Sequence, residues 1–171
     1  MIFLTVGTGV PFDRLVKAVD EAIEARVVTM PVFAQIGRTD LRPRNMEYVP
    51  VLEKSQFDQK VADAAFVISH AGIGSIMTAL ELRKRILVMP RMKRHGEVNS
   101  DHQVACARRF AELGQILAAY DNAELPMRLH EIESFVPVFR TVQVDRVALR
   151  VARFLEEIGV YGMQATGGRH G

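Results

Sequence analysis

Residues 65–83, with the sequence AFVISHAGIGSIMTALELR, decide the fold that the chain is expected to adopt. The segment opens with a short apolar run of the kind found in buried strands, passes through Gly72 and Gly74, and continues with good helix formers. This order indicates a strand that turns directly into a helix. Five further apolar runs predict strands, at residues 2–6, 31–36, 48–51, 85–89 and 116–119.

Helical spacing of apolar residues fills most of the intervals between these strands. It predicts helices near residues 12–23, 57–65, 76–83, 101–113 and 147–158. Strands that alternate with helices indicate an α/β fold, a Rossmann-like parallel sheet with helices on both faces. We expect one domain over residues 1–160 and a disordered, Gly-rich tail over residues 161–171.

The composition limits the classes of protein to which the chain can belong. Its 171 residues are 49% hydrophobic and 25% charged with a net charge of +2, which suits one globular domain and not a dedicated nucleic-acid binder. Cys106 is the only cysteine, so one chain forms neither a disulfide nor a cysteine-based zinc site. The sequence shows no signal-peptide pattern and no apolar run of the ~20 residues that a membrane helix needs. We therefore expect a cytoplasmic protein.

Ligands of parallel α/β sheets bind beyond the carboxyl ends of the strands, which directs attention to three loops. The loop after residues 65–69 carries Gly72 and Gly74 directly before a helix. The free N–H groups and the dipole of that helix attract an anion, for which a diphosphate is the natural candidate. The alternative, that the glycines merely allow a tight turn, stays open at this point. The segment is neither a P-loop nor a GxGxxG motif.

The loop after residues 2–6 is the second candidate. Thr8 has a hydroxyl that can donate to a phosphate, and Gly9 leaves room for one. The plain alternative is ordinary turn chemistry, with Asp13 complementing the N-terminus of the next helix.

The third candidate is the polar loop over residues 90–103, PRMKRHGEVNSDHQ. It is too long and too polar for a simple connector, which is typical of binding loops. Ser100 or Asp101 is expected to cap the next helix. The histidines and carboxylates here show no recognised metal-ligand spacing, so no metal is expected. Cys106 falls on the helical spacing of a small buried thiol and not of a nucleophile.

The combined motifs resemble the C-terminal, donor-binding domain of the GT-B glycosyltransferases related to the peptidoglycan lipid N-acetylglucosaminyltransferase. The stand-alone form of that domain is more similar still, as in the catalytic subunit of the dolichol-pathway N-acetylglucosaminyltransferase and in bacterial exopolysaccharide and capsule subunits. The resemblance covers residues 1 to about 117. The matching motifs are IFLTVGTG, FDRLVKAVD, ISHAGIGSIMTALEL, RILVMPR and DHQVACARRF.

The resemblance implies a site for a UDP-sugar donor. By motif position, Gly72, Gly74 and Ser75 hold the diphosphate, and Thr8 and Gly9 approach it from the first loop.

Other motif positions match the sugar and nucleoside ends of the donor. Asp101, His102 and Gln103 match the segment that faces the sugar, and Pro90 and Arg91 match the loop near the uracil. Many relatives hold the ribose with a glutamate where this chain has Thr78. Either Thr78 makes a weaker contact, or Glu97 or Glu81 reaches the ribose.

The resemblance also implies a mechanism, namely inverting transfer of a hexose without a bound metal or other cofactor. A GT-B enzyme has two domains, so a membrane-anchored partner subunit is expected to bind a lipid-linked sugar acceptor at the inner face of the cytoplasmic membrane. Arg91, Lys93 and Arg94 would then lie near anionic headgroups. The general base is either on the partner or is His70, for which a structural hydrogen bond is the other interpretation. The alternative function is a non-catalytic nucleotide-binding regulatory or scaffold module.

Overall fold

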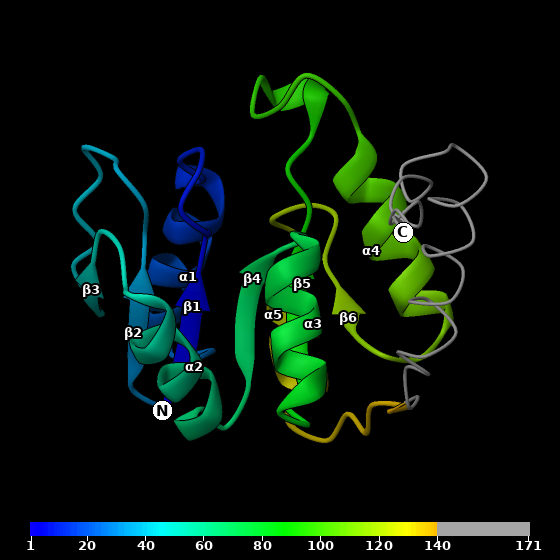
Figure 1. Ribbon diagram of the computed structural model, residues 1–171. Coiled ribbons are helices and arrows are strands. Elements are labelled where there is room, and N and C mark those ends of the chain that lie inside the picture. The colour runs from blue at the N-terminus through cyan, green and yellow to red at the C-terminus, as the bar shows by residue number, and fades with distance from the viewer. Residues whose placement is uncertain (140–171) are drawn as a thin grey trace, which may run out of the picture. The chain divides into compact units, whose positions relative to one another are not determined.

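The computed structural model describes residues 1–139, which fold around one six-stranded sheet (Figure 1). All neighbouring strands are parallel, in the order β3-β2-β1-β4-β5-β6. The strands are β1 (Ile2–Thr5), β2 (Val32–Gln35), β3 (Glu47–Val49), β4 (Val67–His70), β5 (Ile86–Met89) and β6 (Leu117–Ala118). The structure thus confirms the predicted α/β class and all six predicted strands.

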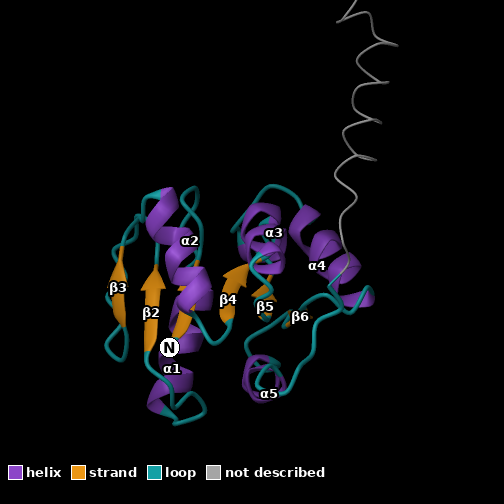
Figure 2. Ribbon diagram, turned by 60° about the horizontal axis from the view of Figure 1, so that its bottom comes forward, coloured by secondary structure: helices purple, strands orange, loops and turns teal. Residues whose placement is uncertain are grey.

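Helices cover both faces of the sheet, which explains why the strands read as nearly continuous apolar runs. One face carries α1 (Asp13–Glu24) and α5 (Leu125–Glu131), and the other carries α2 (Lys54–Asp63), α3 (Ile73–Glu81) and α4 (His102–Glu112) (Figure 2). Each face has its own buried cluster, because alternate strand residues point to opposite sides. In α1, for example, Leu15, Val16 and Val19 are fully buried against the sheet.

Two elements were not predicted from the sequence. Helix α5 buries Leu125 and Leu129, but it is only 7 residues long and has a proline in its first turn. The turn η1 (Lys93–His95) is a short 3-10 helix inside the polar loop after β5. The predicted helix at 147–158 and the predicted tail at 161–171 lie outside the described residues. Over residues 1–139, no helix is both long and apolar enough to span a membrane.

The strand order reverses between β1 and β4, and this switch point lies in the middle of the sheet. The carboxyl ends of all strands point to the top edge in Figure 1, where the loops after β1, β4 and β5 meet. The connection from β2 to β3 starts at the same edge, although no sequence motif pointed to it. Crevices at such switch points are the usual ligand sites of open α/β sheets.

Candidate anion-binding site

The first turn of α3 has backbone N–H groups that donate to no acceptor in the described part of the chain. The first bond of the helix runs from the N–H of Ile76 to the carbonyl of Gly72 at 3.1 Å. Within residues 1–139, the N–H groups of Ile73, Gly74 and Ser75 have no acceptor, and no side chain caps the helix. Since Gly74 is exposed, these donors lie at the surface, where an anion can reach them.

The start of α3 differs from the starts of the other described α-helices. Each of those begins with a carboxylate at the N-cap or first position, namely Asp13, Glu53, Asp101 and Glu124. In α3 the corresponding residues are Gly72 and Ile73, and its first turn has no acidic side chain. The positive end of this helix dipole is therefore not balanced by a carboxylate at its own N-cap or in its own first turn.

The glycines of the two central loops fall into two kinds. A Cβ atom on Gly72 would lie 2.1 Å from Nε2 of His70, and one on Gly7, whose φ is +76°, would lie 2.8 Å from Cε1 of the same ring. In contrast, a Cβ atom on Gly9 or Gly74 would meet no atom within 4 Å, and neither residue has a positive φ. A side chain at Gly7 or Gly72 would thus have to displace the His70 ring, and only Gly7 also has a positive φ, while Gly9 and Gly74 leave open space that the fold does not fill.

His70, the last residue of β4, lies between the loops after β1 and β4. Its Nδ1 is 3.3 Å from Oγ of Ser69. Burial, followed by the positive charge of Arg91, lowers the pKa of His70 to about 4, although a backbone hydrogen bond with Thr5 opposes the shift. At neutral pH the imidazole is therefore uncharged, and its ring fills the space between Gly7 and Gly72.

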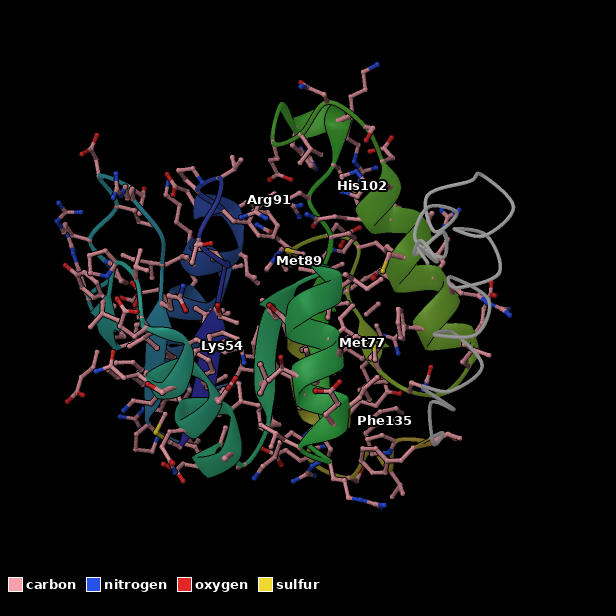
Figure 3. The ribbon with its side chains drawn as sticks, viewed as in Figure 1. Lys54, Met77, Met89, Arg91, His102 and Phe135 are labelled. Atoms are coloured by element: carbon pink, nitrogen blue, oxygen red, sulfur yellow. The ribbon has the colours of Figure 1, made fainter. Side chains whose placement is uncertain are left out.

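Arg91, which follows Pro90 after the end of β5, lies at the carboxyl edge of the sheet (Figure 3). It is almost completely buried, at 4% exposure. Its Nη2 donates to the carbonyl of Val6 at 2.8 Å and also to that of Val10, so the guanidinium closes the loop after β1. Its own backbone N–H donates to Oε1 of Gln103 at 3.0 Å. The guanidinium is also 4.9 Å from the ring centroid of Phe12. Arg91 therefore holds two loops together and, being buried, lies apart from the exposed Lys93 and Arg94.

Glu97 is held by Arg14, an arginine that no sequence motif singled out. Nε and Nη2 of Arg14, on α1, donate to its two carboxylate oxygens at 2.7 and 2.9 Å, and the N–H of Met92 donates at 2.9 Å. Nη2 of Arg14 also donates to the carbonyl of Pro90 at 2.9 Å. Burial alone would raise the pKa of Glu97, but the hydrogen bonds from Arg14 and Met92 and the charges of Arg14 and His95 keep it below the usual value. The loop after β5 is thus fixed to α1.

The remaining predicted site residues lie on the same edge, but they differ in what they contact. Asp101 occupies the N-cap position of α4, yet its Oδ1 accepts from the N–H of Lys93 at 2.8 Å and makes no cap hydrogen bond, which corrects the predicted capping role. Ser100 does not cap α4 either, because its Oγ is 2.8 Å from Nδ1 of the exposed His102. His102 starts α4 at the same edge as Arg91 (Figure 3).

Gln103 is buried and uses its side-chain oxygen within the fold. Thr78 is half-buried on α3, Ser75 is half-buried in its first turn, and Thr8 is exposed after β1. In the described part of the chain no three His, Cys, Asp or Glu side chains converge as a metal site would require. Burial raises the pKa of the half-buried Cys106 thiol, which favours its protonated form at neutral pH.

The sheet order and the uncapped helix at its switch point define a Rossmann-like α/β domain with free backbone donors at its carboxyl edge. The profile of the glycosyltransferase family 28 C-terminal domain matches residues 1–133, and the chain belongs to this family.

The similar proteins agree with this membership. Subunit ALG13 of the UDP-N-acetylglucosamine transferase from Candida glabrata is 40% identical over 57 residues, which are 33% of this chain and 27% of that protein. The match therefore spans about a quarter of the relative. An NMR structure of ALG13 aligns with a TM-score of 0.57 and 20% identity over 96% of both chains. MurG from Acinetobacter baumannii aligns with a TM-score of 0.55 and 19% identity over 76% of this chain and 39% of MurG. The resemblance to GT-B C-terminal domains is thus confirmed.

Proposed function

We propose that this domain binds the diphosphate of a UDP-sugar at the first turn of α3 and forms the donor-binding half of a two-component glycosyltransferase. The observation that carries the proposal is the set of three N–H groups, at Ile73, Gly74 and Ser75, which have no acceptor within residues 1–139, together with the open space beside the Cα of Gly74. Family membership supports the reaction class, and the name of the Candida glabrata relative supports the uridine donor.

The chemistry follows from what a helix N-terminus can stabilise. An acceptor hydroxyl attacks the anomeric carbon of the donor sugar, the bond from that carbon to the diphosphate breaks, and the electron pair leaves with UDP. Negative charge then grows on the departing diphosphate beside the free N–H groups and the dipole of α3. This stabilisation replaces that of a metal ion, so we propose an inverting, metal-independent transfer. Thr8 and Gly9 approach the same phosphate groups from the loop after β1.

The hydroxyl proton of the acceptor needs a base, and we assign it to the acceptor-binding protein. His70 has a pKa of about 4, which makes it a weak proton acceptor at neutral pH, and its ring is enclosed by two glycines. The donor sugar extends toward Asp101 and His102, which lie at the start of α4 on the same edge. We propose Thr78 as the ribose contact, because Glu97 is engaged by Arg14.

The missing half is proposed to be a membrane-anchored subunit that carries the acceptor site and recruits this domain to the cytoplasmic face of the membrane. Its acceptor is a lipid-linked sugar of polysaccharide biosynthesis, and the group transferred is a hexose. The support is the family, together with the relative's description as one subunit of a transferase.

Calorimetry with UDP and ADP on the wild type and on Gly74→Val tests this proposal. The wild type should bind UDP and discriminate against ADP. The valine fills the space beside the free N–H groups, so UDP affinity should fall by roughly ten- to a hundredfold, the equivalent of one or two charge-assisted hydrogen bonds.

Ser55→Val is the matched control, because Ser55 is the exposed second residue of α2, as Gly74 is of α3. It should leave UDP binding unchanged. If Gly74→Val is folded by circular dichroism and binds UDP as the wild type does, the assignment of the site is wrong.

A further inference from the structure

Buried polar side chains gather beneath the loop after β1. Within residues 1–139 six polar or charged residues are buried, and five of them lie at the carboxyl ends of the strands or directly beyond: Thr5, Gln35, Ser69, Arg91 and Gln103. Oγ1 of Thr5 accepts from the N–H of Gly7 at 3.1 Å, and Nε2 of Gln35 donates to the carbonyl of Gly7 at 3.4 Å. Because burial of polar groups is costly, their concentration here indicates that the conformation of this loop matters.

Arg91 is the charged member of this group. Its Nη2 donates to the carbonyls of Val6 and Val10, which lie on either side of residues 7–9. Between these two contacts, Thr8 and Gly9 are exposed. The guanidinium therefore holds both ends of the loop and leaves its middle at the surface, where a ligand can reach it.

The positive charge of Arg91 has no carboxylate in contact with it. Within residues 1–139 no Asp or Glu forms an ion pair with Arg91, and its buried Nε has no hydrogen-bond partner. Glu97 is the carboxylate whose charge acts on Arg91, but both its oxygens accept from Arg14. Burial lowers the pKa of Arg91, and Glu97 opposes this shift only in part. A buried cation without a contacting anion is costly, so a bound anion would stabilise it.

The sheet brings Arg91 close to the first turn of α3. Strands β4 and β5 are neighbours with His70 opposite Met89, so the chain that leads to Arg91 leaves the sheet roughly 5 Å from the end of β4. The His70 ring lies against Gly7 on one side and against Gly72, the N-cap of α3, on the other. The charge of Arg91 acts on this ring, since it helps to lower the pKa of His70. An anion at the α3 turn therefore lies within range of the same charge.

We propose that Arg91 is a positioning residue of the donor site, which holds the loop after β1 beside the α3 turn and whose positive charge favours a bound diphosphate. This assignment rests on the proposed function, because it takes a diphosphate to occupy the α3 turn. The effect is reciprocal, since the diphosphate offsets the cost of the buried charge.

Titration of Arg91→Met and Arg91→Lys with UDP, pyrophosphate and uridine, followed by NMR of backbone amides, tests this role. Both variants lose the guanidinium that bridges two carbonyls, but only the lysine keeps the charge. Arg91→Met should bind UDP and pyrophosphate roughly tenfold more weakly, as expected for the loss of one charge close to a diphosphate. Arg91→Lys should recover most of this affinity. Uridine, which has no phosphate, should bind the wild type and both variants alike.

The comparison of the two variants separates charge from shape. Equal weakening by lysine and methionine would show that only the conformation of the loop matters, and would overturn the proposal. Circular dichroism checks that each variant is folded. If Arg91→Met is not folded, Arg91→Gln replaces it, because glutamine is neutral but keeps a donor for one carbonyl.

Arg94→Met is the matched control, because it removes an exposed arginine from the same loop. It should leave the affinities for UDP and pyrophosphate unchanged. If it weakens both as much as Arg91→Met does, the attraction is diffuse and Arg91 has no particular role.

The two proposals can fail separately. Pyrophosphate binding that depends on the charge of Arg91, in a protein that does not bind UDP, would end the proposed function and leave this role of Arg91 standing. Normal binding of UDP and pyrophosphate by a folded Arg91→Met, together with weakened binding by Gly74→Val, would end only this inference.

Discussion

The loop after β5 and the loop after β4 reach the same edge of the sheet, but they use their polar groups in opposite ways. The loop after β5 is rich in charged side chains, and most of them contact the protein itself: Arg91 binds two backbone carbonyls and Glu97 binds Arg14. The loop after β4 has hardly any charge, yet its backbone N–H groups have no acceptor within residues 1–139. Polar composition alone therefore does not mark the residues that are available to a ligand.

The largest expected effect separates the two glycines of the loop after β4. Gly72→Ala should reduce the free energy of unfolding by about 3 kcal/mol, because the new Cβ would lie 2.1 Å from the His70 ring. Gly74→Ala, two residues on, should change stability by less than about 1 kcal/mol, since no atom lies within 4 Å of its Cβ. Urea denaturation measures both.

A second substitution sharpens this comparison. His70→Ala should partly restore the stability of Gly72→Ala, because it removes the ring that the alanine meets. If the losses in the free energy of unfolding of the two single variants simply add in the double variant, the His70 ring is not the group that the alanine at position 72 clashes with.

The next effect is the pH dependence of stability that His70 causes. Its folded-state pKa of about 4 is below the ordinary value of 6.5, so the unfolded chain binds more protons between these two values. The free energy of unfolding is therefore highest above pH 6.5 and falls as the pH is lowered to about 4. The expected fall is about 2 kcal/mol, after allowing for the partial exposure of the His70 ring. Denaturation of the wild type and of His70→Gln from pH 7 to 4.5 measures it. A slope that persists in His70→Gln would point to another group.

A smaller effect is expected at the ion pair that fixes the loop after β5. Glu97→Gln keeps the shape of the side chain but removes its charge, so the free energy of unfolding should fall by about 1–2 kcal/mol at pH 7. Because the folded-state pKa of Glu97 is lowered, the difference from the wild type should shrink as the pH falls below about 4.5. Asp58→Asn, which breaks an exposed pair on α2, is the control and should cost less than about 0.5 kcal/mol.

The smallest effect concerns the first residue of α4, His102, which follows the loop after β5. His102→Ala should weaken binding of a UDP-sugar a few-fold, the equivalent of about 1 kcal/mol, and leave binding of UDP unchanged, because its exposed ring lies at the start of α4 and not at the α3 turn. Calorimetry with both ligands measures the ratio. Equal weakening of both would place His102 near the nucleotide and not near the sugar.

The sequence predicted most of the fold, because buried parallel strands leave unbroken apolar runs and all six were visible. It missed α5, whose 7 residues are too few for a clear helical period. It also missed Arg14, which meets Glu97 from 83 positions away in the chain, a contact that no local pattern encodes. The motif drew attention to Gly72 and Gly74 together, but only their surroundings in space separate Gly72, which lies against the His70 ring, from Gly74, which has open space beside it.

The two outermost strands of the sheet are very short, with three residues in β3 and two in β6. Each exposes few unpaired backbone groups along its rim, and Pro50 directly after β3 offers no N–H to a neighbouring chain. Another polypeptide therefore gains little by extending this sheet sideways. A protein that associates with residues 1–139 is therefore expected to recognise loop and helix side chains.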